Sequence, residues 1–249
     1  MAKGTGLAQN FYLHGLNLSG DVGAIDKAAS PRAVLDVTAI DKSAVERVLA
    51  RIDGLLEFSV YFNDASEQEH ASLKGMPTTD VLVVYANRET IGAVAGLLRA
   101  KQVNYDWARG QDMSLVGKVQ CVADGVPLEW GEMLTAGPDL IASSGSQASK
   151  DDAASTSYGL MAILHIFDIG SGTPTVVIED SPNNSTWATL VSFAAVAAGS
   201  DPTAERVVVN GTVDRYLRIT VTGTFTNLSL AIAYRRGTAF DISDLGYGA

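Results

Sequence analysis

Short runs of alternating hydrophobic and polar residues recur through the first half of the chain. The run LLEFSVYFN places Leu56, Phe58, Val60 and Phe62 on one face. Its other face carries Glu57, Ser59 and Tyr61. A period of two residues indicates a β-strand with one buried and one solvated side. The same alternation predicts strands over residues 33–40, 103–107 and 113–123, and residues 80–87 are apolar on both faces, as expected of a covered strand. Among these runs, the residues expected to enter a core include Leu35, Val37, Ala39, Val103, Tyr105, Trp107, Met113, Leu115, Val119 and Cys121.

Two short helices are expected between these strands. Ser43 and Glu46 form a capping-box pattern ahead of the run VERVLARI. A second capping box at residues 66–69 precedes a helix that Gly75 and Pro77 would end. At a helical period, the first run presents one apolar side, which consists of Val45, Val48, Leu49 and Ile52.

A shift in composition divides the chain into two parts. Residues 141–155 are small, polar and rich in Gly and Ser, which is typical of a linker. Residues 1–140 are expected to form the first domain. Residues 156–237 read as short strands separated by SGTP, SPNNS and similar turn signals, which predicts an Ig-like antiparallel β-sandwich. Residues 238–249 would form a C-terminal tail.

The composition agrees with a folded, mainly β chain, because 47% of the 249 residues are hydrophobic and 18% are charged. Cys121, the single cysteine, cannot form an internal disulfide, so packing or assembly must stabilise the fold. The sequence MAKGTGLAQN lacks the apolar run of a signal peptide, and no segment suits a bilayer span, so a soluble cytoplasmic protein is expected. A net charge of −10, spread over both halves, disfavours tight binding to DNA phosphates.

Motifs for catalysis or metal binding are missing from the sequence. The stretch GLNLSGDV has two glycines at the spacing of a phosphate-binding loop, but Asp21 stands where such a loop has lysine. The three histidines, His14, His70 and His165, have no partners at metal-ligand spacing. No nucleophile–base pair or paired-carboxylate motif is present. The sequence therefore predicts a protein that is not an enzyme and uses no cofactor or metal.

Several longer stretches together form a recognisable order of strands, helix and turns. In the first domain these are FYLHGLNLSGDVGAI, AVLDVTAIDKSAVERVLARIDGLLEFSVYFND, PTTDVLVVY and AKQVNYDWARG; in the second they are SYGLMAILHIF, DRYLRITVTGTF and LAIAYRR. This order resembles the major tail tube proteins of long-tailed bacteriophages over residues 8–237. The resemblance implies a β-barrel-like tube domain with a flanking α-helix, followed by a β-sandwich that decorates the outside of the tube.

The resemblance also implies a function and partners. It points to a structural virion protein that polymerises into stacked rings, commonly hexamers, and so builds the hollow tail conduit for genome delivery. Expected partners are further copies of the chain, the tape measure protein, and tail terminator and baseplate proteins. DNA would pass through the lumen without specific binding, and no membrane is involved. The protein would be assembled in the host cytoplasm and reside in the virion tail.

The same resemblance places contacts between subunits and rings in residues 1–10, 19–32 and 63–80, with the glycine-rich loop as a flexible contact. The expected contact residues are Phe11, Tyr12, Ser19, Asp21, Asp64, Glu67, Lys74 and Met76. The residues expected to line the lumen are Asp36, Glu57, Ser59 and Gln120. Lys118 shares the nominal face of Gln120 and counts against an entirely acidic lumen.

Two alternative functions stay open at this point. The second domain could be a carbohydrate- or cell-surface-binding module in which Trp187, in a polar loop, stacks on a sugar; Trp187 equally suits a core position at the start of a strand. The chain could also be a capsid decoration protein, which would polymerise only on capsids. Trp107 and Trp130 are expected in the core.

Overall fold

The structure, a computed structural model, describes residues 8–238. It confirms a mainly β protein, with one short helix in that range. Most of the expected arm at residues 1–10 lies outside the described residues, and so does the expected tail at 238–249 apart from Thr238. No helix between residues 8 and 238 is long and apolar enough to cross a membrane.

The elements follow one another with short connections. The first half of the chain forms β1 (Asn10–Leu13), β2 (Leu16–Asn17), β3 (Val22–Ala29), β4 (Arg32–Asp36), β5 (Arg47–Ile52), β6 (Leu55–Tyr61), α1 (Glu69–Leu73), β7 (Val81–Ala86), β8 (Val94–Arg109), β9 (Leu115–Ala123) and β10 (Glu129–Met133). The second half forms β11 (Asp139–Ile141), β12 (Gly145–Ser146), β13 (Lys150–Asp151), β14 (Leu160–Gly172), β15 (Thr175–Ser181), β16 (Ala188–Ser192), β17 (Thr203–Val209), β18 (Tyr216–Thr222) and β19 (Phe225–Arg236).

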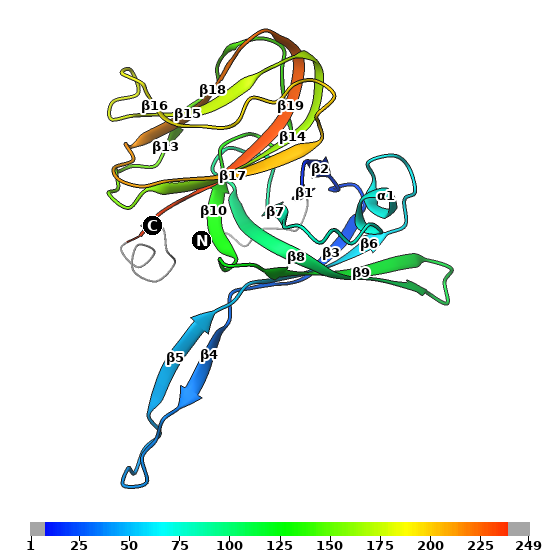
Figure 1. Ribbon diagram of the computed structural model, residues 1–249, viewed down its shortest axis with the longest axis vertical. Coiled ribbons are helices and arrows are strands. Elements are labelled where there is room, and N and C mark those ends of the chain that lie inside the picture. The colour runs from blue at the N-terminus through cyan, green and yellow to red at the C-terminus, as the bar shows by residue number, and fades with distance from the viewer. Residues whose placement is uncertain (1–7, 239–249) are drawn as a thin grey trace.

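Four strands of the first half form one antiparallel layer in the order β3, β6, β9 and β8. The amino-terminal part of β8 also pairs with β7, which pairs in turn with β1. The hydrophobic residues that alternate along these strands meet in one core, and the helix α1 lies at its side with Leu73 fully buried (Figure 1). Core members include Phe11, Leu56, Phe58, Val60, Val119 and Cys121.

The second half is an antiparallel sandwich. One of its sheets contains β14 between β17 and β19, and the other contains β15 and β18 with the shorter strands β12, β13 and β16. Alternating residues of both sheets fill the space between them, including Leu164, Ile178, Leu217, Ile219, Leu230 and Ile232. Facing sheets with interdigitated aliphatic side chains are the usual arrangement of such sandwiches.

A continuous sheet joins the two halves. β10 pairs with β8 through Glu129–Glu132 on one side, and with β19 through Glu132 and Met133 on the other. A separate core fills this junction, with Tyr12, Leu97, Met133, Met161 and Ile163 among its members. The backbone N–H of Gly15 donates to His165 Nδ1 at 3.0 Å across the same junction. The two halves are therefore packed against each other as well as connected by the chain.

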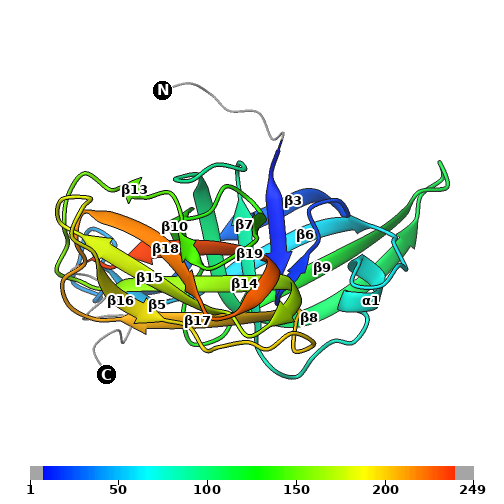
Figure 2. The same cartoon turned by 90° about the horizontal axis from the view of Figure 1, so that it is seen from above.

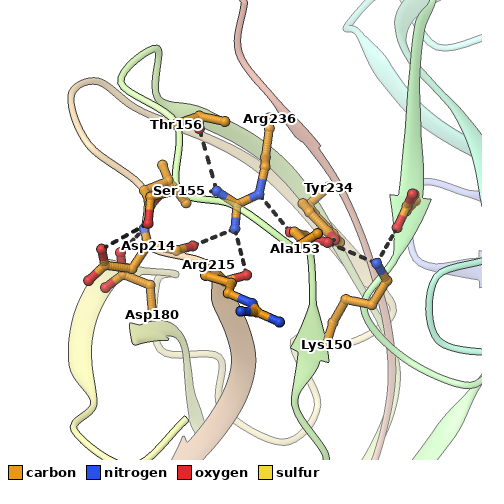
Figure 3. Close-up of polar contacts among 12 residues, drawn as sticks. Lys150, Ala153, Ser155, Thr156, Asp180, Asp214, Arg215, Tyr234 and Arg236 are labelled. Atoms are coloured by element: carbon orange, nitrogen blue, oxygen red, sulfur yellow. Dashed lines mark hydrogen bonds and ion pairs between the residues drawn. The ribbon is translucent and has the colours of Figure 1, made fainter. Parts of the chain in front are cut away.

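Residues 141–155 make many ordered contacts, although their composition predicts a linker. Within this stretch, β12 and β13 pair with β18. Asp152 accepts hydrogen bonds from Tyr234 at 2.7 Å and Arg236 at 2.6 Å, and Lys150 bridges Asp152 and Glu132 at 2.8 and 2.9 Å (Figure 3). The division into domains at this stretch stays a prediction. The stretch itself is hydrogen-bonded to β18 of one sheet and to β19 of the other.

The helix expected over VERVLARI is wrong, because residues 47–52 form strand β5. β5 pairs with β4 in a separate two-stranded sheet. The apolar spacing of this run fits a helix, yet Val45, Val48 and Ile52 are β-branched residues that favour strands. The second expected helix exists as α1, but it begins after Gln68, which makes no side-chain capping bond.

Several expected core positions are exposed. Leu35 and Val37 are 54% and 49% exposed because β4 and the residues after it lie outside the body. Met113, at the turn between β8 and β9, is 74% exposed, and Leu115 and Phe62 are 43% and 42% exposed. Strand β8 has a bulge between Gln102 and Asn104, and Val103, which lies in this bulge, is 46% exposed. Trp130, also expected in the core, is 49% exposed.

Candidate assembly surface

The outer side of the β3–β6–β9–β8 layer carries polar residues from all four strands. Along β6 the core side holds Leu56, Phe58 and Val60, so Glu57 and Ser59 project from the opposite side. Strand register places Glu57 beside Gln120, and Ser59 beside Lys118. We call this surface the polar sheet face; its residues are Asp26, Lys27, Glu57, Ser59, Asn104, Asp106, Lys118 and Gln120.

Hydrogen bonds run across the polar sheet face from strand to strand. Ser59 donates its hydroxyl to Asp26 at 2.6 Å, and Lys118 Nζ lies 2.7 Å from the same carboxylate. Gln120 donates its amide to Glu57 at 2.9 Å. The bonds from Lys118 and then Ser59 lower the pKa of Asp26. On this surface Lys118 and Asp26 form an ion pair, whereas Glu57 and Asp106 accept hydrogen bonds from neutral amides, so the surface is not exclusively acidic.

Both borders of this layer are unpaired within the described residues. β3 pairs with β6 only, and the carboxyl-terminal part of β8, residues 103–109, pairs with β9 only. Backbone N–H and C=O groups along such borders can accept a further strand, and monomeric proteins usually protect them. The polar sheet face therefore ends on each side in a border suited to strand addition.

The hairpin formed by β4 and β5 projects away from the body of the protein (Figure 1). Thr38 accepts the backbone N–H of Glu46 through its hydroxyl at 2.9 Å, which extends the ladder toward the turn. Large aliphatic side chains lie exposed along its whole length. They are Val34, Leu35, Val37, Ile40, Val45, Val48 and Leu49, each at least 49% exposed.

Both faces of this hairpin are apolar. Leu35 pairs with Val48 on one face, and Val34 pairs with Leu49 on the other. A two-stranded hairpin in water is marginally stable by itself, and a contiguous exposed apolar surface is typical of an interaction site. Because the body covers neither face, another protein surface must cover the hairpin if its aliphatic side chains are to be buried.

The residues expected to line a lumen are only partly together. Glu57, Ser59 and Gln120 share the polar sheet face. Asp36 lies on the projecting hairpin opposite Arg47, and its carboxylate accepts bonds from Thr38. Sequence reasoning missed Asp26, because residues 19–32 were expected to be a contact loop, whereas residues 22–29 form β3.

The expected contact residues fall into two groups. Asp64, Glu67, Lys74 and Met76 are exposed around α1. Phe11 and Tyr12 are 2% and 0% exposed, so their side chains stabilise the subunit core. Ser19 and Asp21 anchor loops: Ser19 accepts the N–H of Phe11, and Asp21 accepts bonds from Asn63 and Glu69. The contact roles of all eight residues stay predictions.

Other chemistry-bearing residues have structural surroundings. Cys121 is fully buried, and burial raises the pKa of its thiol to about 12. In residues 8–238, no group of three or more His, Cys, Asp or Glu residues could hold a metal ion. The guanidinium carbon of Arg218 lies 4.0 Å from the ring centre of Trp187, so this cation covers one face of the ring that a sugar would need.

The fold and this surface together define a mainly β protein with open sheet borders and a projecting aliphatic hairpin. Comparison with protein-family models finds no match, and comparison with curated proteins finds none either. Solved structures that align with this chain include a protein of a phage hub adsorption apparatus and a phage baseplate. The SPP1 Dit protein aligns with a TM-score of 0.34 at 7% identity, over 92% of this chain and 100% of its own.

Two structures of the phage p2 baseplate in its activated conformation align in the same way. The strontium form has a TM-score of 0.33 at 7% identity, over 92% of this chain and 99% of that chain. The calcium form has a TM-score of 0.32 at 9% identity, over 93% and 99%. Likeness at these scores carries no argument about the function of this chain.

Proposed function

We propose that this chain is a structural subunit of a bacteriophage tail, and specifically the tail tube subunit that polymerises into stacked rings. The observation that carries the proposal is the polar sheet face with its two open borders. If β3 of one copy pairs with residues 103–109 of the next, the layers join into a closed wall that is polar on its free side. The proposed number of six subunits per ring rests on the sequence resemblance.

The projecting hairpin provides a contact along the axis of such a tube. Its aliphatic pairs Leu35–Val48 and Val34–Leu49 would be buried against subunits of the adjacent ring. Burial of apolar side chains contributes about 25 cal/mol per Å² of surface removed from water, so this hairpin suits a repeated and stable contact. It replaces the loop at 19–32 as the main proposed ring-to-ring contact.

The polar sheet face suits a passage for DNA that does not bind it. Proteins hold DNA mainly through Lys and Arg contacts to phosphates. Lys118 is engaged by Asp26 at 2.7 Å, Lys27 lies beside Glu57 in the strand register, and Asp106 adds a further negative charge. DNA and the tape measure protein would therefore meet a hydrated surface with little net attraction for phosphate.

Electron microscopy of the purified protein, combined with a single proline at an open border, tests this proposal. The backbone N–H of Tyr61 donates to Asp21, so the backbone groups of Tyr61 point toward β3. Backbone direction alternates along a strand, so those of Glu57, four residues earlier, also point toward β3, where Glu57 pairs with Lys27. The N–H of the next residue, Ala28, then points to the open border. Ala28→Pro removes this donor, and Ala28→Ser keeps it. Tubes are expected from the wild type and Ala28→Ser, and dispersed folded subunits from Ala28→Pro.

A second variant, at the opposite border, keeps the test valid if Ala28→Pro fails to fold. Gly110 donates its N–H to Ser114 inside the β8–β9 hairpin, so the N–H of Arg109 points outward. Arg109→Pro should also prevent tube formation while circular dichroism shows an unchanged fold. Normal tubes from both folded proline variants, or a wild type that stays monomeric at high concentration, would contradict the proposal.

A further inference from the structure

The open border of β3 carries a cation that the subunit does not pair. Lys27 is exposed on the polar sheet face, and the strand register places it opposite Glu57 of β6. The carboxylate of Glu57 accepts the side-chain amide of Gln120 at 2.9 Å. Among residues 8–238, no carboxylate forms an ion pair with Lys27. The charge of Lys27 is therefore available to a neighbouring molecule.

The open border of β8 carries an acid in the corresponding situation. Asp106 is exposed on the polar sheet face, and its carboxylate accepts the side-chain amide of Asn104 at 2.7 Å. Lys118 lies opposite Asp106 in the strand register, but its ammonium group bonds Asp26 at 2.7 Å. No cation in the described part of the chain forms an ion pair with Asp106. Opposite charges thus remain unpaired at the two open borders of one layer.

The backbone of the two borders limits how they can pair with each other. The strands β3, β6, β9 and β8 alternate in direction, so β3 and β8 run in opposite directions. Copies related by rotation about a tube axis keep these directions, so β8 of one copy meets β3 of the next as an antiparallel pair. On β3, the backbone groups of Ala28 point to the open border. On β8, those of Arg109 point outward, and so do those of residues 107 and 105 by alternation.

Outward-pointing residues form the hydrogen-bonded pairs of an antiparallel ladder, so Ala28 can pair with residue 105, 107 or 109 of the neighbouring copy. Pairing with residue 105 places Lys27 opposite Asp106. The other two registers place Lys27 opposite residue 108 or 110, which are an alanine and a glycine. Opposite charges directly across a ladder favour pairing. One of the three registers is therefore favoured by charge.

The side chains of this register also lie on consistent sides of the joined layers. Ala28 and Tyr105 are both partly buried against the core of the layer, and their pairing keeps both on that side. Lys27 and Asp106 both lie on the polar sheet face. The small side chain of Ala28 leaves space beside the ring of Tyr105.

We propose that an ion pair between Lys27 of one copy and Asp106 of the next fixes the register in which adjacent subunits join. This inference rests on the proposed function, because it requires β3 of one copy beside β8 of another. It adds the residues that select one pairing from those that the backbone allows. It also gives Lys27 an acidic partner, which leaves this cation less able to hold DNA phosphates.

A charge exchange tests the ion pair. Lys27→Glu and Asp106→Lys each place like charges across the border, and each should raise the critical concentration for tube assembly about fivefold. The double variant Lys27→Glu/Asp106→Lys restores an attractive pair, and it should assemble near the wild-type concentration. Salt near 1 M should reduce the penalty of the single variants, because it screens exposed charges. Urea denaturation of dispersed subunits shows whether any variant has lost stability.

Disulfide trapping measures the register while both charges are kept. Ala28→Cys/Tyr105→Cys should give a ladder of covalent oligomers after mild oxidation, because hydrogen-bonded partners lie within disulfide range. The matched control Ala28→Cys/Trp107→Cys replaces an aromatic residue two positions away and should give little crosslinking. A bridge within one copy is excluded, since the two borders are separated by three strand spacings, or about 14 Å. Cys121 stays in place, because its thiol is buried.

The outcomes separate this inference from the tube proposal. Recovery of assembly in the double charge variant, together with crosslinking at positions 28 and 105, supports the inference. Tubes that crosslink at positions 28 and 107 instead, or a double variant that assembles no better than the single ones at unchanged subunit stability, would overturn the inference and leave the tube proposal standing. A wild type that forms no tubes, with no crosslinking in either cysteine pair, would overturn both.

Discussion

The β14–β19 pair and the β4–β5 hairpin are both antiparallel ladders of aliphatic residues, but their surroundings differ completely. β14 and β19 are flanked by further strands, and the side chains of Leu164, Leu230 and Ile232 are at most 2% exposed. β4 and β5 pair only with each other, and Leu49 is 60% exposed. Figure 2 shows the first pair crossing the body, and Figure 1 shows the second outside it. The same local pattern therefore serves folding in one region and, we propose, assembly in the other.

The largest expected difference comes from a matched leucine truncation in the two regions. Leu230→Ala removes a fully buried side chain and should lower the free energy of unfolding by about 2–5 kcal/mol. Leu49→Ala, on the hairpin, should change it by less than about 0.5 kcal/mol. Urea denaturation of dispersed subunits measures both values. Microscopy should then show fewer or shorter tubes from Leu49→Ala. A comparable loss of subunit stability in both variants would mean that the hairpin belongs to the cooperative core.

A glycine at the junction of the halves gives the next largest effect. Gly15 has φ of +87°, and a Cβ there would overlap the backbone of Thr203. Gly15→Ala should destabilise the body by about 2–4 kcal/mol, through backbone strain and steric overlap. Gly20→Ala is the control, because nothing lies within 4 Å of its added Cβ. Differential scanning calorimetry compares the two; equal melting temperatures would show that the junction accommodates the methyl group.

Acid should destabilise the body through His165 and leave the hairpin unaffected by that route. His165 is fully buried, and burial, with a smaller contribution from His14, lowers its pKa from 6.5 to about 3. The unfolded chain therefore binds a proton that the folded chain excludes as pH falls below 6.5. The free energy of unfolding should therefore fall by about 1.4 kcal/mol for each pH unit below 6.5.

The variant His165→Asn isolates this effect, because its amide oxygen can replace Nδ1 as acceptor for Gly15 but does not titrate. Its unfolding free energy should fall less steeply than that of the wild type between pH 6.5 and 5, whatever its absolute stability. Parallel slopes for the two proteins would show that His165 is protonated in the folded state. Denaturant titrations at a series of pH values provide the slopes.

Sequence patterns predicted the body better than the hairpin for a physical reason. The period-two alternation of β6 and of the Val119–Cys121 part of β9 predicts one buried and one solvated side. The structure has the buried side as expected, whereas on the other side Ser59 is buried, 9% exposed, where it bonds Asp26. In the hairpin neither side is buried by the subunit, so Val48 and Leu49 fit a helical period equally well. Local pattern alone does not distinguish these alternatives.

The candidate surface was predictable in part for the same reason. Alternation placed Glu57, Ser59 and Gln120 on one polar side. It gave no sign of Asp26, because two register shifts interrupt the pairing of β3 and its small residues suggested a loop. The open borders depend on which strands pair at long range, and a single sequence does not contain that information. The exposure of Trp130 likewise depends on long-range pairing, because β10 pairs with β19 only at Glu132 and Met133.

The smallest expected effect concerns the charged pair near the hairpin turn. Lys42 Nζ lies 3.5 Å from Glu46 Oε1, and both side chains are about half exposed, at 45% and 52%. Water and salt screen such a pair, so Glu46→Gln should change subunit stability by less than about 0.5 kcal/mol. Tube yield from Glu46→Gln should equal that of the wild type if aliphatic burial alone drives the ring-to-ring contact. A strong loss of tubes at unchanged subunit stability would show instead that this carboxylate forms a specific contact with the neighbouring ring, and would make the hairpin a polar as well as an apolar interface.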